Sequence, residues 1–175
     1  MRLIKPSFEI LEQEPGIQGI YKQIERAGRT CYKSEDRITE DSAEKFVNMI
    51  KDRQHTAMLE HGTVYLSCSD AEFIYLGLRY ECNNYSNVVW EEFAPGHRTK
   101  VYITTNYRVL YENNWLDDLK YLCEPTEYHE KRITVKFICD RGVSHEFVRH
   151  RVFSFAQEST CLLYTSPSPR DRQKS

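Results

Sequence analysis

The sequence predicts one α+β domain, and three observations lead to that class. The chain has 175 residues, enough for one compact core with little room for a second. Hydrophobic residues make up 40% and charged residues 29%, an ordinary globular composition that excludes a disordered chain. Helix-like and strand-like segments follow one another without a repeat or a low-complexity linker, so we treat the chain as one unit.

A strand and a helix are expected in the first thirty residues. Residues 3–11 are strand-like, and a turn is expected at 14–16. The apolar residues that follow recur at spacings of three and four, which predicts one face of a helix: Ile17, Ile20, Ile24 and Ala27. That helix should end near Gly28.

A second helix and a second strand are expected next. The helical pattern repeats over 43–50, and Asp41 with Glu44 three residues later predicts a capping box at its start. Residues 63–68 are strand-like, and residues 133–139 alternate well enough to form another strand.

The segment between these strands is harder to interpret. Residues 69–132 are rich in tyrosine, asparagine and charge, with a strand-like stretch at 101–104 and a helix-like stretch at 115–122. We treat this segment as an elaboration within the same domain.

The net charge and the lengths of the apolar runs limit the kinds of partner that the chain could bind. The net charge of −2 gives no overall field that would draw the chain onto nucleic acid or an anionic membrane. The longest apolar run, 73–78, is far shorter than the roughly 20 residues of a membrane span, and charge and Pro6 interrupt the start before a signal-like region forms. Six cysteines without a C-x-x-C pair suggest neither a zinc cage nor a disulfide framework. We expect a cytoplasmic protein in which any anion site is local.

The end of the chain differs in character from the rest. Residues 161–175 contain two prolines, three serines and a basic finish without periodicity. They resemble the translated read-through of a transposase adaptor used in preparing sequencing libraries, so we expect an artefactual tail and exclude it from fold reasoning. The residues before it hold 21 basic and 25 acidic side chains, a net charge of −4. On this interpretation the domain is 1–160 and is incomplete.

The densest cluster of chemistry-bearing side chains is at 140–159, directly after the last expected strand. Gly142 and Ser144 favour a turn and a helix start, and Val143 and Phe147 would face the core. The short helix would then present a run of basic residues at its far end.

That basic run, Arg149-His150-Arg151, has two interpretations. Cations are favourable at a helix C-terminus by about 0.3 to 1 kcal/mol, so the run could be structural. Alternatively it is an anion cradle, since two guanidinium forks can bind phosphate and an imidazole can contact a ring or a developing charge. Gln157, Glu158 and Ser159 follow closely and could add hydrogen bonds.

Other chemistries fit the cluster poorly. His145 and His150 are five residues apart and would not share a helix face, and Arg149 occupies the position that a zinc protease needs for its second histidine, so we expect no metal. No G-x-S-x-G elbow surrounds Ser144, Ser154 or Ser159, and neither G-x-G-x-x-G nor a P-loop occurs.

Two earlier patches also carry polar chemistry. The first, Arg29-Thr-Cys-Tyr32, follows the first expected helix and taken alone is an ordinary helix exit with a buried cysteine. The second runs from His55 to His61 between a helix and a strand, where loops commonly carry function. Within it Glu60 could simply orient His61 by a hydrogen bond.

Taken in order, the three patches resemble the flavin-dependent thymidylate synthases. The family signature is Arg-His-Arg, seven residues and then Ser, and Arg149-His150-Arg151 followed by 152–158 and Ser159 fits it in spacing and identity. Both upstream patches match the family as well. The resemblance therefore covers most of the chain up to Ser159, outside the central elaboration.

The resemblance implies a reaction and an architecture. The reaction is reductive methylation of dUMP to dTMP, with methylenetetrahydrofolate as carbon donor and FAD, reduced by NADPH, as hydride carrier. The fold implied is α+β with a mostly antiparallel sheet and flanking helices, assembled as a homotetramer with shared active sites. FAD and dUMP both carry phosphate, so closely spaced arginines suit them.

The family also implies roles for individual residues. Arg149, His150 and Arg151 match flavin contacts, and Cys31 falls where relatives carry a small hydroxyl residue near the flavin. On the dUMP side, the matching positions are Glu146, Arg149 and Ser159, and Gln157 matches a position that contacts both ligands. Ser159 is expected to bind rather than attack, since no base is evidently placed to activate it.

Three departures from the family are visible. Ala57 stands where relatives have a hydroxyl, so that contact should be lost or replaced by Thr56. Cys161 stands where the family has an arginine, which supports the adaptor interpretation and predicts an arginine codon after Thr160 in the genome. A further arginine that polarises the uracil ring would lie beyond this chain, so we expect weak binding and no turnover.

A function from another class stays open. Arg149 and Arg151 could hold phosphate in a noncatalytic nucleotide- or RNA-binding module, with nearby Tyr or Phe side chains stacking on bases. The negative net charge of the chain argues against that class.

Overall fold

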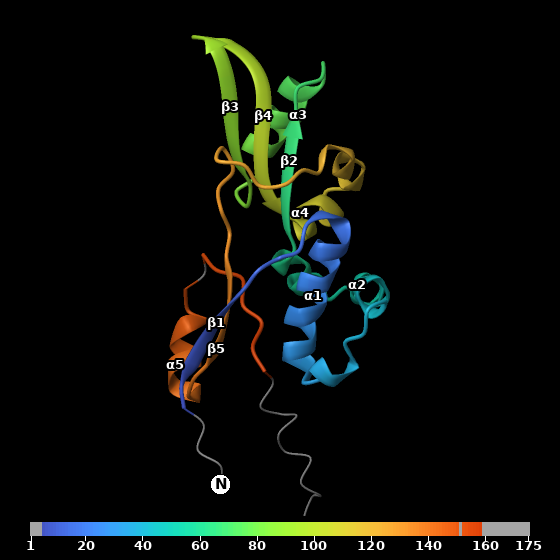
Figure 1. Cartoon of the computed structure of the whole chain (residues 1–175), viewed down its shortest axis with the longest axis vertical. Helices are drawn as coiled ribbons and strands as arrows, with labels where there is room; N and C mark the ends of the chain where they lie inside the picture. Colours follow the sequence, from blue (N-terminus) through green and yellow to red (C-terminus); the bar gives the residue numbers. More distant parts are fainter. Residues whose placement is uncertain (1–4, 151, 159–175) are drawn as a thin grey trace, which may run out of the picture.

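The computed structural model describes residues 5–150 and 152–158, and its strands form two separate antiparallel sheets (Figure 1). In the smaller sheet β1 (Ser7–Leu11) pairs with β5 (Thr134–Ile138). In the larger sheet β4 (His97–Asn106) lies between β2 (Thr63–Cys68) and β3 (Asn87–Ala94). The predicted α+β class with antiparallel pairing is therefore confirmed.

The helices differ widely in length. The α-helices are α1 (Gly16–Tyr32), α2 (Ser42–Asp52), α3 (Phe73–Glu81), α4 (Tyr107–Glu112) and α5 (Arg141–Phe147). The described residues also form three 3-10 helices: η1 (Glu35–Arg37), η2 (Thr56–His61) and η3 (Leu116–Tyr121). Within the described ranges, none of the helices has both the length and the apolar character needed to cross a membrane.

Helix α1 forms where its apolar spacing predicts it, but it does not end at Gly28. Ile20 and Ile24 are fully buried. A Cβ on Gly28 would lie 2.5 Å from Cε1 of Phe46, so this glycine permits close packing of α1 against α2 rather than stopping the helix. The helix ends one turn later, where Lys33 takes a left-handed conformation (φ 48°) and Ser34 N–H donates to Arg29 O at 3.0 Å.

Helix α2 lies where its pattern predicts it, but the predicted capping box is wrong. Asp41 makes no side-chain hydrogen bond at the helix start, and its backbone (φ −107°, ψ 10°) lacks the extended conformation of a typical N-cap. Ser42 fixes the turn instead, because its Oγ accepts from Thr39 N–H at 2.9 Å and donates to Glu25 Oε2 at 2.9 Å.

The strand predictions are confirmed, with changes at the ends. The strand expected over 3–11 begins only at Ser7, and residues 3 and 4 lie outside the described residues. β2 spans 63–68 as predicted, and β5 is one residue shorter than predicted at each end. The strand-like 101–104 lies inside β4, whereas the helix-like 115–122 becomes the 3-10 helix η3. The central segment, 69–132, supplies two of the three strands of the larger sheet.

The hydrophobic core lies between the larger sheet and the helices packed on it. We call this part the central body: α1, α2, η2, α3, α4 and the β2-β4-β3 sheet. Its buried side chains come from all of these elements except β3, and the largest fully buried ones are Tyr80 and Tyr107.

A second group of elements forms what we call the arm: β1, β5 and α5, which lie together to one side of α1 (Figure 1). Helix α5 begins after Asp140, whose carboxylate accepts from Val143 N–H at 3.1 Å. The prediction that Val143 and Phe147 face the core is wrong, because both are exposed and α5 has no buried residue. Phe147 stacks on Phe137 of β5 instead, with ring centroids 5.1 Å apart.

Candidate functional site

The three sequence patches meet along one line of contacts, which we call the seam. It joins residues 152–158, which run between the arm and α1 (Figure 1), to the end of α1 and to η2. Ser154 Oγ donates to Glu60 Oε2 at 2.8 Å, and Lys33 Nζ pairs with Glu158 Oε1 at 2.8 Å. The seam therefore brings the segment after the basic run against both upstream patches.

Cys31 and Gln157, both predicted to contact the flavin, lie together at the seam. The Cys31 thiol is half-buried, 3.8 Å from Sδ of Met58. Burial raises the pKa of this thiol, while its hydrogen bond with the backbone of Gln157 partly opposes that shift. Gln157 Nε2 also donates to Ser144 Oγ of α5 at 2.8 Å, so one residue links α1 with the arm. A thiol with a raised pKa is a poor nucleophile near neutral pH.

The His61 imidazole is partly buried beside the same segment. Burial lowers its pKa, and a hydrogen bond with the backbone of Phe155 and the charge of Glu60 oppose that shift. Its Nε2 is buried without a hydrogen-bond partner among the described residues. The expectation that Glu60 orients His61 by a hydrogen bond is wrong, because the Glu60 carboxylate bonds Arg108 and Ser154 instead.

The first patch connects to the second through an aromatic pair. Tyr32 Oη and His55 Nδ1 are 2.7 Å apart, and their rings stack with centroids 6.4 Å apart. Arg29 has a structural role, since its Nε donates to the buried Glu25 Oε1 at 2.8 Å and its guanidinium lies over the Phe46 ring. Thr56, which precedes Ala57 in the chain, donates from its Oγ1 to Glu112 Oε1 at 2.8 Å. Its hydroxyl proton is therefore already used in a hydrogen bond within the protein.

Arg149 and His150, the described residues of the basic run, follow α5 and lie in water. Arg149 pairs with Glu146 at 3.1 Å, and both side chains are mostly exposed. His150 is exposed, with its ring 6.4 Å from that of Phe153. Arg151 and Ser159, the other predicted contacts, lie outside the described residues.

Two residues of this region have no signal in the sequence. Arg108 comes from α4 in the central segment and contacts Glu60, and Ser154 belongs to the spacer of the signature, where residue identity is not specified. Their partners are 48 and 94 residues away in the chain, so no local pattern could have found them.

A cysteine–histidine pair elsewhere does not form a nucleophilic dyad. Cys123 Sγ lies 3.8 Å from Nε2 of His129, which is buried. The Thr126 N–H donates to His129 Nδ1 at 3.0 Å, so Nε2 carries the proton, which it shares with Leu66 O at 3.1 Å. A ring nitrogen that already carries a proton cannot take one from the thiol.

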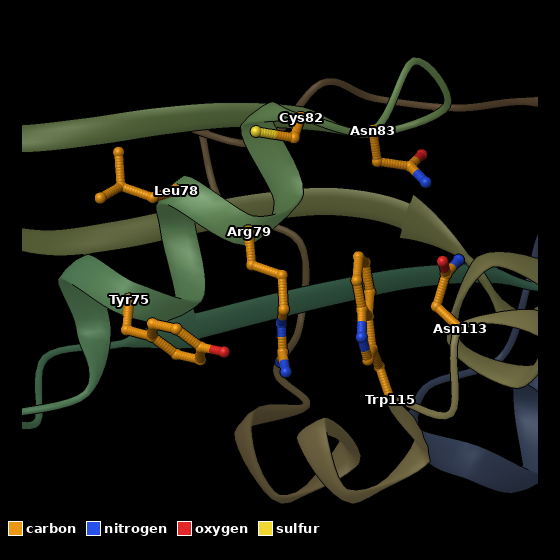
Figure 2. Close-up of a pocket in the computed structure, with 7 residues that line it drawn as sticks. All are labelled: Tyr75, Leu78, Arg79, Cys82, Asn83, Asn113 and Trp115. Carbon is orange, nitrogen blue, oxygen red and sulfur yellow. The ribbon is translucent and has the colours of Figure 1, made fainter.

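The structure also contains an open pocket of about 550 Å³ on the central body, shown in Figure 2. Arg79 lies between Tyr75 and Trp115, with Cζ 5.7 Å and 4.7 Å from the two ring centroids, and pairs with Asp118. Asn83 and Asn113 add amide groups to the wall. The lining contains none of the predicted site residues.

Neither the described side chains nor comparison with known proteins points to a metal site or a family. The described residues contain no group of three or more His, Cys, Asp or Glu side chains that could hold a metal ion. Comparison with models of protein families, with curated proteins and with solved structures finds no significant match.

Proposed function

We propose that this chain is part of a flavin-dependent thymidylate synthase, which converts dUMP to dTMP in the cytoplasm. One observation carries the proposal: the Arg149-His150-Arg151 signature with Ser159 at the family's spacing, whose intervening segment contacts both upstream patches at the seam. Three short motifs that match separately by chance would have no reason to meet in space. The family's particular fold is part of the same proposal.

The residues around the seam suit an anionic, ring-containing cofactor. Arg149 and Arg151 would hold phosphate or the reduced flavin ring, with His150 beside them. The buried and unpartnered Nε2 of His61 leaves one hydrogen-bonding position open for a polar group. Cys31 and Gln157 would complete the cofactor contacts, and Glu146, Arg149, Gln157 and Ser159 would bind dUMP.

The protein's contribution in this proposal is binding and orientation. FAD, once reduced by NADPH, supplies the hydride, and methylenetetrahydrofolate supplies the carbon. The thiol of Cys31 stays protonated because burial raises its pKa, which suits a contact rather than an attacking group. Guanidinium groups near the nucleotide would neutralise phosphate and fix its position.

A homo-oligomer, a tetramer by resemblance, is part of the same proposal, and the arm supports it. Phe8 is 70% exposed, and Ile10 and Phe137 are also largely exposed on this two-stranded sheet. A two-stranded sheet is marginally stable by itself and normally needs a packed partner. A second copy of the chain would cover this surface and bring a second basic run near it.

The proposal is tested by titrating the purified chain with FAD, following flavin fluorescence and calorimetric heat. We expect weak but measurable binding that Arg149→Ala with Arg151→Ala weakens at least about tenfold, since hydrogen bonds to charged groups contribute about 1.5 to 3 kcal/mol each. Arg53→Ala with Arg98→Ala removes the same charge from exposed positions away from the signature and should leave affinity unchanged.

Two outcomes would contradict the proposal. A chain that is colourless once excess FAD has been removed, and that releases no heat during the titration, does not bind flavin. Salt-sensitive retention on RNA without flavin would instead favour the noncatalytic module.

A further inference from the structure

One side chain of the central segment reaches the seam. Arg108, in the first turn of α4, pairs with Glu60 of η2 through one terminal nitrogen. Its Nε donates to Glu112 Oε1 at 2.7 Å, and Thr56 Oγ1 donates to the same oxygen at 2.8 Å. Arg108 therefore connects α4 with the start and the end of η2.

The Glu60 carboxylate is shared between two distant parts of the chain. Oε1 accepts from Arg108, and Oε2 accepts from Ser154 Oγ at 2.8 Å. Because the two oxygens belong to one rigid group, the orientation that Arg108 imposes on the first also determines where the second lies. Ser154 is in turn three residues before Gln157 and five before Ser159.

Electrostatics favour this arrangement. The hydrogen bond to Glu112, followed by that to Glu60, raises the pKa of Arg108 despite its burial. Burial would raise the pKa of Glu112, but the hydrogen bonds from Arg108 and Thr56 and the charge of Arg108 lower it overall. Without Arg108, two carboxylates would face each other with no cation between them, and Glu60 would turn toward water.

We propose that Arg108 is a positioning residue that orients Glu60 so that Ser154 and the segment 152–158 stay docked at the seam. The central segment is then connected to the candidate site rather than being a separate decoration. The inference deepens the proposed function, on which its consequence for ligand binding rests. Its structural part stands without any ligand.

Hydrogen exchange measured by mass spectrometry on the full chain tests the structural part. We expect Arg108→Gln to speed exchange over 152–158 about fivefold and to leave the exchange rates in β4 unchanged. About fivefold corresponds to the loss of one charge-assisted hydrogen bond at a partly exposed site. Ser154→Ala should have a similar effect. The double variant should exchange no faster than the faster single variant, because both changes break one chain of contacts.

Two further variants separate positioning from a general loss of stability. Arg108→Lys keeps a cation that reaches one carboxylate, so it should restore part of the protection that Arg108→Gln loses. Arg98→Gln is the matched control, since the Arg98 side chain is 36% exposed against 34% for Arg108 and pairs with one carboxylate of the β3–β4 hairpin. It should leave 152–158 unchanged.

The outcomes that overturn the inference are specific. Unchanged exchange over 152–158 in Arg108→Gln, or additive effects with Ser154→Ala, would show that Arg108 does not act through Glu60. Equal acceleration in β4 would show a global effect instead.

The FAD titration then distinguishes the two proposals. If the unmodified chain binds FAD, Arg108→Gln should weaken that binding about fivefold and Arg108→Lys less. If the unmodified chain binds no FAD, the proposed function fails while the exchange result still decides the role of Arg108. Unchanged FAD affinity in a variant whose 152–158 segment exchanges faster would show that the docked segment does not shape the ligand site.

Discussion

The central body and the arm differ in how much of their apolar surface they bury. In the central body, β2 and β4 each bury most of their residues, and α1 and α2 place their apolar faces on the same core. In the arm, α5 buries no residue and most residues of β1 are exposed. Phe137, the aromatic residue of β5, is 51% exposed. The basic run follows directly from the part of the molecule with the least core of its own.

The largest expected difference concerns one isoleucine in each region. Ile103 in β4 is 0% exposed and Ile10 in β1 is 54% exposed. Ile103→Ala should lower the free energy of unfolding by about 3 kcal/mol, because it removes buried methyl groups and leaves a cavity. Ile10→Ala should cost less than about 1 kcal/mol. Chemical denaturation of both variants measures the contrast, and equal losses would show that the arm is packed as tightly as the body.

A smaller difference in the free energy of unfolding is expected when two ion pairs of similar spacing, one in each region, are broken. Glu25 and Arg29 of α1 have side chains 2% and 13% exposed, whereas Glu146 and Arg149 in the arm are 66% and 73% exposed. Glu25→Gln should cost about 2 kcal/mol, because it leaves the Arg29 charge poorly compensated in a buried site. Glu146→Gln should change stability by less than about 0.5 kcal/mol.

The measurement is again the free energy of unfolding, now at low and high salt. Only the small Glu146 contribution should decrease with added salt, since water and ions screen exposed charges. A salt-sensitive loss in Glu25→Gln would mean that its site is open to solvent.

Local periodicity was sufficient to predict the elements of the central body that bury one face. The spacing of Ile20 and Ile24 predicted α1, and 63–68 predicted β2 to the residue, because a buried stripe leaves a repeating pattern. The same reasoning failed for Val143 and Phe147, since an apolar pair on a short helix does not show whether a core lies opposite. The β3–β4 hairpin was recognised only over 101–104, because polar residues are interspersed along both strands and interrupt the apolar pattern.

The sequence offers candidate site residues, but it does not show which of them contact one another. The family resemblance, rather than any local pattern, pointed to Cys31 and Gln157, and the structure brings these two residues together. Sequence could not reveal that Glu60 turns to Arg108 and Ser154 rather than to His61, because that choice depends on α4 packing beside η2. Contacts between segments that are far apart in the chain leave no periodic signal.

The smallest expected effect concerns His129, whose ring is buried against β2 of the central body. Burial lowers the pKa of His129, although a hydrogen bond to Leu66 O partly opposes this shift. Since the unfolded ring has a pKa of about 6.5, the unfolded chain binds a proton below that pH while the folded chain does not. Stability should therefore decrease as pH falls below about 6.5 toward the lower pKa of the folded state.

Unfolding experiments between about pH 7.5 and pH 5.5 test this window, which spans the ordinary histidine pKa. His129→Gln should reduce the dependence of unfolding free energy on pH, even though losing its hydrogen bonds lowers stability throughout. Part of the slope should remain, because burial also lowers the pKa of His61. An unchanged slope in His129→Gln would contradict this account, because the folded ring would then bind protons as readily as the unfolded one.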